Sequence, residues 1–210
     1  MAESRCLQLF VREPVAGKVK TRLEARLGRE KTLSLYHAML RRQILLANHC
    51  EGTLRQLWVA GHTSHADFAD FADFAGDRFM QPAGDIGERM SYALRSALAD
   101  HDQAILIGCD CPGMDVSYLE QAFAVLSSGQ DAVLGPATDG GYVLIGLRRW
   151  DPVLFRDIDW GTGIVLAQTR ARLAEAGYTW SELAALDDID EPADLERLAA
   201  MVEREYGLKL

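Results

Sequence analysis

The sequence predicts a single-domain α/β protein in which helices flank a mostly parallel, doubly wound sheet. Three observations lead to this prediction. Short apolar runs alternate with segments of helical periodicity, as in successive βαβ units. The run Ala104–Gly108 is entirely apolar, as expected for a strand covered on both faces. No linker, compositional break or long repeat divides the 210 residues, so we expect one domain over residues 1–210.

The strands of this sheet are predicted from short apolar runs bounded by turn residues. In the first of them only Gln8 interrupts the apolar pattern. The predicted strands are Cys6–Val11, Leu54–Ala60, Ala104–Gly108, Asp131–Gly135 and Tyr142–Leu147.

Helices are predicted where apolar residues recur every three or four positions. Tyr36, Leu40 and Ile44 follow this spacing in the longest of them. We expect Thr162 to be the N-cap of another helix, and Pro192 to lie in the first turn of the last one. The predicted helices are Glu30–Ala47, Ser64–Ala75, Ile86–Ala99, Asp115–Leu126, Thr162–Ala176 and Glu191–Tyr206.

Charge and composition exclude several functions. The chain has 31 acidic and 22 basic residues and a formal net charge of −9. A non-specific nucleic-acid or anionic-membrane surface requires excess Lys and Arg, so we expect neither partner. No apolar run approaches the roughly 18–20 residues of a membrane helix, and the N-terminal segment lacks the apolar core of a signal peptide. We therefore expect a cytoplasmic protein without membrane insertion, with four reduced cysteines.

The segment after the first strand is unusually basic for an acidic protein. In doubly wound sheets, ligands bind beyond the carboxyl ends of the strands. At this place the chain has Gly17 among four basic residues, Arg12, Lys18, Lys20 and Arg22. Glycine lets the backbone approach a ligand closely, and the cations suit a di- or triphosphate. Neither a Walker A loop nor a Gly-x-Gly-x-x-Gly motif is present, and a solvated basic turn is an equal alternative.

An acidic residue follows the central apolar strand. Asp110 lies two positions beyond Gly108, at the predicted ligand-binding edge of the sheet. Its carboxylate is a hard oxygen donor suited to Mg²⁺ or Mn²⁺, whereas the alternative is a role in a turn or a helix cap. The flanking Cys109 and Cys111 do not indicate zinc, because no second pair lies at zinc-site spacing.

Three other polar segments allow both a structural and a functional interpretation. Asp139–Tyr142 is typical of a tight hairpin turn, or of backbone that must approach a ligand. Gly84–Met90 opens a helix in which Asp85 is a natural N-cap, and Arg89 either reaches a phosphate or pairs with an acid. Asp187–Pro192 contains three Asp residues before a helix. Capping of the helix explains one of them. The other carboxylates repel each other unless solvent or a cation screens their charges.

Together these segments resemble a bacterial family of GT-A-like glycosyltransferases, long catalogued as a domain of unknown function. More distantly, they are similar to molybdenum-cofactor and phospholactate guanylyltransferases. The resemblance covers nearly the whole chain. It is carried, in order, by Gly17–Leu23, Gly84–Met90, Gly108–Pro112, Asp139–Tyr142, Leu144–Leu147, Trp160–Thr162 and Asp188–Leu195.

The resemblance implies a nucleotide-diphospho-sugar transferase fold and a divalent metal cofactor, Mg²⁺ or Mn²⁺. It implies that Asp110 holds the metal. Asp190 falls where sugar-acid cytidylyltransferases have a second metal carboxylate, although Glu191 replaces a Thr of that motif. The first loop departs from the glycine-rich loop of many nucleotidyltransferases and leaves the nucleobase open.

These observations assign a hypothetical role to each candidate residue. Asp110 and Asp190 would hold the metal. Asp139 and Tyr142 would face the acceptor, with Asp139 as a candidate general base. The candidates for binding phosphate or nucleoside are Arg12, Gly17, Lys18, Lys20, Arg22, Gly84, Asp85, Gly87 and Arg89.

Two transferase reactions fit this set of residues. In glycosyl transfer, an acceptor hydroxyl attacks a nucleotide-activated sugar. In nucleotidyl transfer, an acceptor phosphate attacks a nucleoside triphosphate and releases pyrophosphate. The closer resemblance favours glycosyl transfer to a small-molecule acceptor, with nucleotidyl transfer as the alternative. A non-catalytic nucleotide-binding module is the third interpretation.

Overall fold

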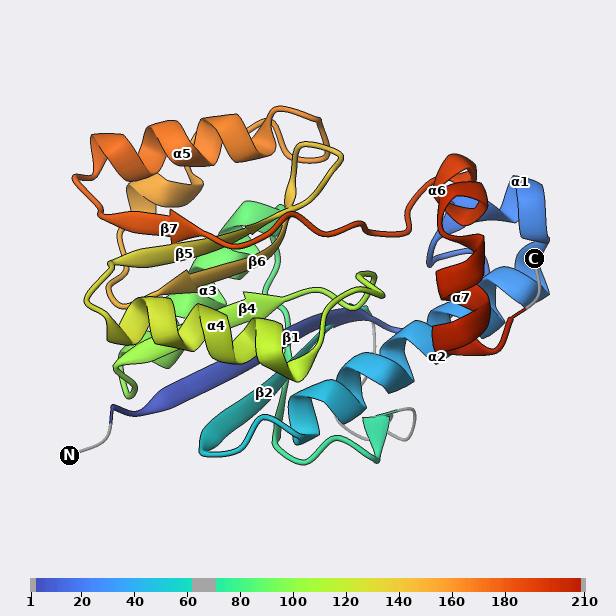
Figure 1. The fold of residues 1–210 in the computed structure, drawn as a ribbon, viewed down its shortest axis with the longest axis horizontal. Helices are drawn as coiled ribbons and strands as arrows, with labels where there is room; N and C mark the ends of the chain where they lie inside the picture. Colours follow the sequence, from blue (N-terminus) through green and yellow to red (C-terminus); the bar gives the residue numbers. More distant parts are fainter. Residues whose placement is uncertain (1–2, 62–70, 209–210) are drawn as a thin grey trace.

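The fold is an α/β sandwich built on one mixed sheet of seven strands (Figure 1). The structure is a computed structural model that describes residues 3–61 and 71–208. The strands lie in the order β3-β2-β1-β4-β6-β5-β7, and β6 is antiparallel to both of its neighbours. The mostly parallel sheet expected from the sequence is thus confirmed. The strands are β1 Arg5–Arg12, β2 Thr53–Ala60, β3 Asp77–Met80, β4 Gln103–Ile107, β5 Ala132–Pro136, β6 Tyr142–Leu147 and β7 Trp180–Glu182.

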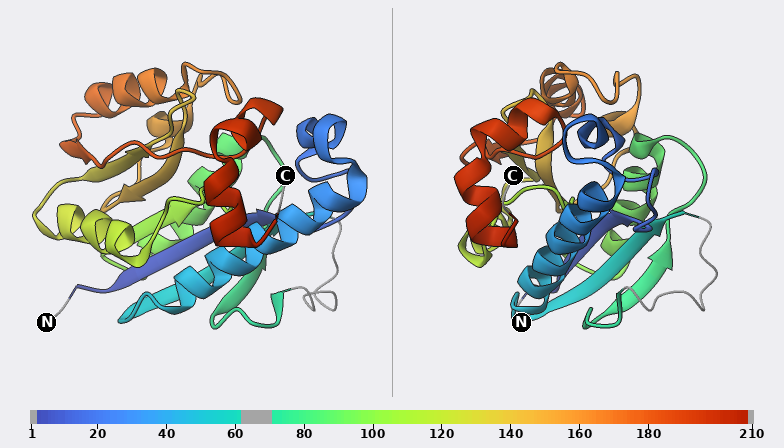
Figure 2. Two further views of the ribbon diagram at one scale, coloured as in Figure 1. Left: turned by 45° about the vertical axis from the view of Figure 1, so that its right-hand side comes forward. Right: turned by 90° about the vertical axis from the view of Figure 1, so that its right-hand side faces the viewer.

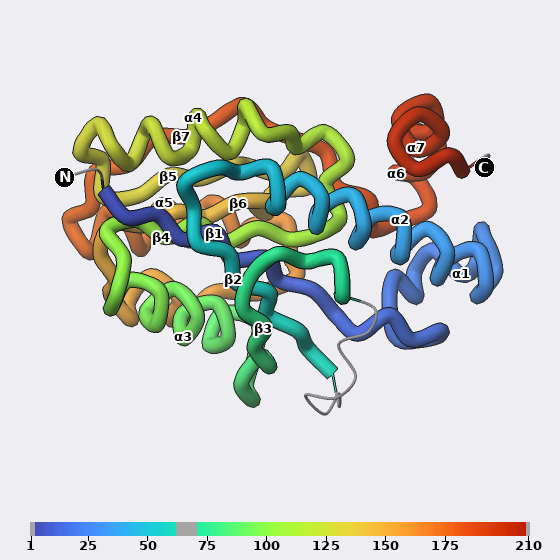
Figure 3. Tube along the Cα trace, turned by 90° about the horizontal axis from the view of Figure 1, so that it is seen from below, coloured from blue at the N-terminus to red at the C-terminus, as the bar shows by residue number. Residues whose placement is uncertain are grey.

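Helices cover both faces of the sheet, which is why its central strands are apolar throughout (Figure 3). Side chains of α2 and α4 pack on the face that carries Leu7 and Leu9 of β1, and those of α3 and α5 pack on the face that carries Cys6 and Phe10. The helices are α1 Glu24–Leu27, α2 Arg29–Asn48, α3 Ile86–Leu98, α4 Val116–Ser127, α5 Val165–Glu175, α6 Pro192–Arg197 and α7 Ala199–Tyr206, with 3-10 turns η1 Thr21–Leu23 and η3 Pro152–Phe155.

A third apolar cluster joins the two ends of the chain. In Figure 2 the C-terminal helices α6 and α7 lie beside α1 and the first half of α2. Ile189, in the strap between β7 and α6, is fully buried in this cluster. Its backbone amide donates to the carbonyl of Asp110 at 3.0 Å, which fastens the strap to the end of β4. This contact brings Asp190 toward Asp110 and the segment after β1.

Two helix predictions are wrong in detail. The helix expected over Glu191–Tyr206 is two helices, because the backbone departs from helical geometry at Leu198 (φ −106°, ψ 13°), whose side chain is buried in the third cluster. Thr162 is not an N-cap, since α5 begins at Val165 and the Thr162 hydroxyl donates to the carbonyl of Asp159 instead.

Other differences concern short elements. The edge strands β3 and β7 were not expected; they have four and three residues and little of the apolar pattern that reveals a strand. Of the helix predicted for 64–75, residues 64–70 lie outside the described residues. Residues 71–75 form a turn that buries Phe71 and Phe74.

All four cysteines are buried and unpaired. Within residues 3–61 and 71–208, no helix combines the length and the apolar composition that crossing a membrane requires.

Replacing Ile189 tests how much the strap depends on the third cluster. We expect Ile189→Ala to lower the free energy of unfolding by about 3 kcal/mol, because a fully buried side chain leaves a cavity. Urea denaturation measures the change. Ile164→Ala is the matched control, since Ile164 is 51% exposed and its loss should cost under about 0.5 kcal/mol. Equal losses for the two variants would contradict a strap held by this cluster.

Candidate functional site

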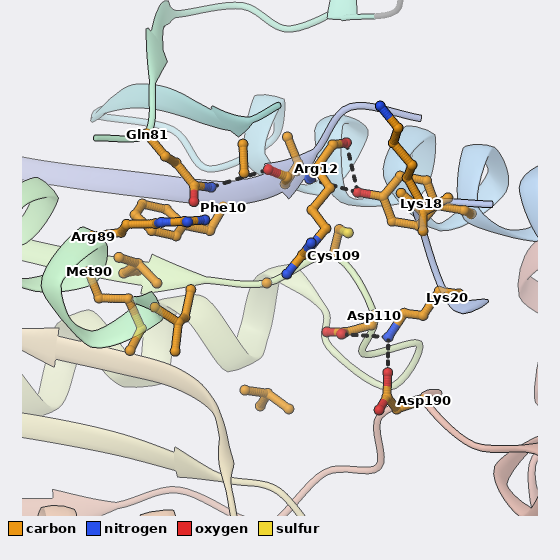
Figure 4. Close-up of a pocket in the computed structure, with 18 of the residues that line it drawn as sticks. Phe10, Arg12, Lys18, Lys20, Gln81, Arg89, Met90, Cys109, Asp110 and Asp190 are labelled. Atoms are coloured by element: carbon orange, nitrogen blue, oxygen red, sulfur yellow. Dashed lines mark hydrogen bonds and ion pairs between the residues drawn. The ribbon is translucent and has the colours of Figure 1, made fainter. Parts of the chain in front are cut away.

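A pocket of about 530 Å³ lies beyond the carboxyl ends of β1 and β4 (Figure 4). Its walls come from the segment after β1, the end of β4, the first turn of α3, the start of β6 and the C-terminal strap. Eight of the residues predicted from the sequence line it: Arg12, Lys18, Lys20, Arg22, Arg89, Asp110, Tyr142 and Asp190. Five others do not: Gly17, Gly84, Asp85, Gly87 and Asp139.

An ion-pair network joins the basic segment to both predicted metal carboxylates. The Lys20 ammonium lies 2.8 Å from Oδ2 of Asp110 and 3.2 Å from Oδ1 of Asp190 (Figure 4). The Arg22 guanidinium lies 2.8 Å from Oδ2 of Asp190 and 3.3 Å from Oε1 of Glu191. One cation therefore contacts carboxylates that are 80 positions apart in the sequence.

The backbone at Lys20 adopts a conformation that non-glycine residues rarely use. Its φ of 47° and ψ of 38° are left-handed, at a cost of about 1 kcal/mol. On either side Val19 and Leu23 are buried, and the amide of Leu23 donates to the Lys20 carbonyl at 2.9 Å. The packing of its neighbours thus holds Lys20 in place, with its side chain directed at the carboxylates.

Burial and charge oppose each other in this network. Desolvation lowers the pKa of Lys20, but the carboxylates of Asp110 and Asp190 outweigh it, so the pKa is raised and the ammonium stays charged. Desolvation raises the pKa of Asp110, but the charge of Lys20 and its hydrogen bond outweigh it, so that pKa is lowered. The Lys20 side chain is only 9% exposed, against 34% for Asp110.

The two carboxylates fit a divalent metal site. One oxygen of each carboxylate contacts the same ammonium nitrogen, at 2.8 and 3.2 Å. A movement of about 1 Å would bring both oxygens to the distance of about 2.0–2.1 Å that Mg²⁺ requires. Among the described residues, no group of three His, Cys, Asp or Glu side chains could hold a metal by itself. At nucleotide sites Mg²⁺ is usually bound by one or two carboxylates, and phosphate oxygens and water complete its coordination.

Gln81 is a pocket residue that sequence reasoning missed. Its side-chain Nε2 donates to the carbonyls of Val11 and Trp58, at 3.2 and 3.0 Å. Since both donors go to backbone, the orientation of the amide is fixed and Oε1 is left as an acceptor toward the pocket (Figure 4). Across from it, Arg89 donates through Nε to the Gly84 carbonyl. An isolated Gln before a proline carries no motif that would reveal this role.

Three predicted nucleotide residues shape the start of α3 instead of lining the pocket. Asp85 and Glu88 form a reciprocal capping box, with both hydrogen bonds at 2.8 Å, so Asp85 is the predicted N-cap. A side chain on Gly84 would collide with the Glu88 carboxylate. A Cβ on Gly87 would lie 2.4 Å from Nε1 of Trp160, so this glycine admits an indole ring.

The Asp139–Tyr142 segment is the hairpin turn between β5 and β6. Oδ1 of Asp139 accepts from the amide of Gly141 at 2.8 Å. A Cβ on Gly140, whose φ is +93°, would lie 2.1 Å from the carbonyl oxygen of Gly163. Gly140 therefore permits close approach of the backbone of Gly163. The ring of Tyr142 lines the pocket, but its hydroxyl is buried, and burial raises its pKa.

The three Asp residues of the strap have different environments. Asp187 accepts from the hydroxyl of Thr138 and pairs with Arg197, and Asp190 belongs to the Lys20 network. Capping explains none of the three, since Glu191 is the N-cap of α6. In Asp188, desolvation, helped by the charges of Asp110 and Asp139, raises the pKa from 3.8 to about 6.

The raised pKa of Asp188 predicts a pH-dependent stability. The Asp188 carboxyl binds its proton more tightly in the folded state than in the unfolded chain. The protonated carboxyl therefore contributes fully to stability below about pH 4, and this contribution is lost as the pH rises through about 6. We expect Asp188→Asn, in metal-free protein, to raise Tm by about 2–4 °C at pH 8, after allowance for solvent screening, and to change it little at pH 4. Calorimetry at both pH values measures this. An equal shift at both would contradict the assignment, and Asp100→Asn is the control.

Gly87→Ala separates the structural role of this residue from the predicted nucleotide contact. The added methyl group would displace Trp160, and we expect a loss of about 1–3 kcal/mol in the free energy of unfolding. In a Trp160→Leu background the same change should cost much less, because the ring is absent. Denaturation of the four proteins measures both effects. Unchanged stability with weakened nucleotide binding would instead favour the predicted contact.

Comparison with known proteins places this fold in a class. A proposed nucleotide-diphospho-sugar transferase from Desulfovibrio desulfuricans G20 is 27% identical, with a TM-score of 0.82 over 98% of this chain and 99% of its own. 4-Diphosphocytidyl-2C-methyl-D-erythritol synthase from Anaerococcus prevotii is 8% identical, with a TM-score of 0.60 over 95% and 97% of the two chains. CMP:2-keto-3-deoxy-manno-octonic acid synthetase, solved with CTP, is 14% identical, with a TM-score of 0.59 over 96% and 100%.

The fold is therefore that of the nucleotide-diphospho-sugar transferases. The model of a family described as an uncharacterised protein conserved in bacteria, DUF2064, matches residues 44–162. This chain belongs to that family, as its sequence motifs suggested. No curated protein matches it.

Proposed function

We propose that this protein is a metal-dependent transferase that passes a sugar from a nucleotide-activated donor to a small-molecule acceptor. The observation that carries the proposal is the pair Asp110 and Asp190, which share one cation at the edge of a basic pocket. A divalent ion and a diphosphate together match these charges, because the carboxylates suit the ion and the surrounding cations suit the phosphates. The names of the similar structures support a nucleotide-linked substrate.

The residues around the pocket would bind the nucleotide from two sides. Lys18 and Arg12, both exposed, would contact phosphate oxygens. The fixed Oε1 of Gln81 would accept a hydrogen bond from an N–H of the nucleobase, and Arg89 would donate from its remaining guanidinium nitrogens. Mg²⁺ or Mn²⁺ held by Asp110 and Asp190 would neutralise charge on the leaving diphosphate.

The acceptor would approach from the acidic side of the site. Asp139 and Asp188 are close enough for their charges to interact, and neither forms an ion pair among the described residues. A carboxylate there would take the proton from the acceptor hydroxyl as that oxygen attacks the sugar carbon. Asp139 remains our candidate base, and Asp188 joins it. The ring of Tyr142 would form an apolar contact with the acceptor or the sugar.

Nucleotidyl transfer is the second candidate, favoured by two observations. Four basic side chains, those of Arg12, Lys18, Lys20 and Arg22, line one pocket, which is enough charge for a triphosphate. Two of the similar structures are by name enzymes that form cytidine-linked products. The products separate the two candidates, since glycosyl transfer releases a nucleoside diphosphate and nucleotidyl transfer releases pyrophosphate.

Metal-dependent nucleotide binding tests the proposal. We expect the wild-type protein to bind at least one of UDP, GDP and CDP in the presence of Mn²⁺, and Asp110→Asn to bind it at least about tenfold more weakly, since one metal carboxylate is lost. Calorimetric titration measures both. The control is Asp100→Asn, which removes one carboxylate from the exposed turn after α3.

Two results would count against the proposed activity. If folded wild-type protein binds no nucleoside di- or triphosphate with Mg²⁺ or Mn²⁺, the proposal is wrong. If it binds one but releases neither a nucleoside diphosphate nor pyrophosphate with any sugar, alcohol or sugar-phosphate acceptor tested, a non-catalytic nucleotide-binding module becomes the better interpretation.

A further inference from the structure

The Lys20 ammonium lies where the two carboxylates would hold a metal ion. It contacts one oxygen of Asp110 and one of Asp190, and both distances are within hydrogen-bond range. A metal ion shared by these carboxylates would take the same oxygen lone pairs, at about 2.0–2.1 Å for Mg²⁺. A divalent cation and an ammonium cannot share that position, because like charges at this separation repel strongly in a partly buried site.

We infer that Lys20 is a tethered cation that occupies the carboxylate pair in the absence of metal and is displaced to the phosphates when metal and nucleotide bind. The inference rests on the proposed metal-dependent function. Lys20 contacts Asp110 and Asp190, and Arg22 contacts Asp190 and Glu191, so both cations are paired with carboxylates in this structure. An incoming divalent ion leaves Lys20 without a partner until an anion arrives.

The geometry allows this displacement without a change of backbone. Lys20 itself lines the pocket, next to Lys18 and Arg22, so its ammonium can reach the pocket interior by rotation of its four side-chain bonds. The flanking residues Val19 and Leu23 are buried and keep the backbone of the segment fixed. A phosphate chain in the pocket would therefore offer Lys20 a new partner within reach.

The exchange would couple metal binding to nucleotide binding. Metal alone must break a buried ion pair, so it should bind weakly. Metal with a nucleoside diphosphate should bind more tightly, because the phosphates take up the displaced ammonium. By reciprocity the metal strengthens nucleotide binding by the same factor. Lys20 would thus make the site respond to the two ligands together.

Mn²⁺ binding without nucleotide tests the inference. We expect Lys20→Met to bind Mn²⁺ at least about tenfold more tightly than wild type, as measured by calorimetry or by the electron paramagnetic resonance of free Mn²⁺. The matched control is Lys18→Met, which removes the same charge from the same segment without contact to a carboxylate; a general electrostatic effect would appear equally in both. Lys20→Met that binds Mn²⁺ no more tightly than Lys18→Met would overturn the inference.

A second measurement needs only wild-type protein, in case Lys20→Met does not fold. The buried Lys20 should react slowly with an amine-acylating reagent, and saturating Mn²⁺ should make its acylation several-fold faster, as followed by mass spectrometry of the peptide. Exposed Lys31 is the internal reference. An unchanged rate at Lys20 while Mn²⁺ is bound would overturn the displacement.

The outcomes also separate this inference from the proposed function. If Mn²⁺ binds to wild type and to both variants with one affinity, the displacement by metal is wrong and the metal-dependent function stands. If Mn²⁺ binds to none of them, even with a nucleoside diphosphate present, the metal dependence is wrong and both fall.

Discussion

The contact on which the site depends is that of one ammonium with two carboxylates. Lys20 comes from the segment after β1, Asp110 from the end of β4 and Asp190 from the strap before α6. A largely buried ammonium is costly unless it is paired, and two carboxylates facing each other are costly unless a cation lies between them. The rest of the fold brings these three groups together: β1 pairs with β4, and the third apolar cluster holds the strap against α2.

Ion pairs of this kind are a weak source of stability, because desolvation offsets most of the attraction. The left-handed backbone at Lys20 adds a further cost. A site that served only stability would be better filled by apolar side chains of similar volume. The structure nevertheless has both the desolvated ion pairs and the left-handed backbone, and both lie at the edge of a pocket, next to exposed cations. That combination favours a ligand-binding role over a purely structural one.

Local patterns in the sequence predicted the central strands and one carboxylate of the site, whereas features set by tertiary contacts were missed. The apolar runs indicated the strands, and an acid after a buried strand identified Asp110. The acidic group Asp187–Asp190 indicated solvent or a cation, but only the resemblance paired Asp190 with Asp110, because no periodicity places residue 190 beside residue 110. Gly87 was expected near a ligand, and Gly140 either near a ligand or in a hairpin turn. In the structure Gly87 makes room for the ring of Trp160, and Gly140 makes room for the backbone of Gly163. A glycine indicates that some group approaches the backbone closely, but it does not indicate whether that group is a ligand or part of the protein. No pattern in the sequence indicated the role of Gln81 or the bridging position of Lys20.

The distribution of charge gives the site a direction. The basic residues, Arg12, Lys18 and Arg22, line the pocket at the end of β1. The acidic residues come from other segments, Asp139 from the β5–β6 turn and Asp188 from the strap, and the charges of Asp110 and Asp139 both act on Asp188. Phosphates would be repelled from the acidic side, so under the proposed function a nucleotide could lie in the pocket in only one orientation. Its reacting group would then point from the cations toward carboxylates able to accept a proton. In an acidic protein, this local separation of charge is what would turn a general nucleotide fold into a site with a donor end and an acceptor end.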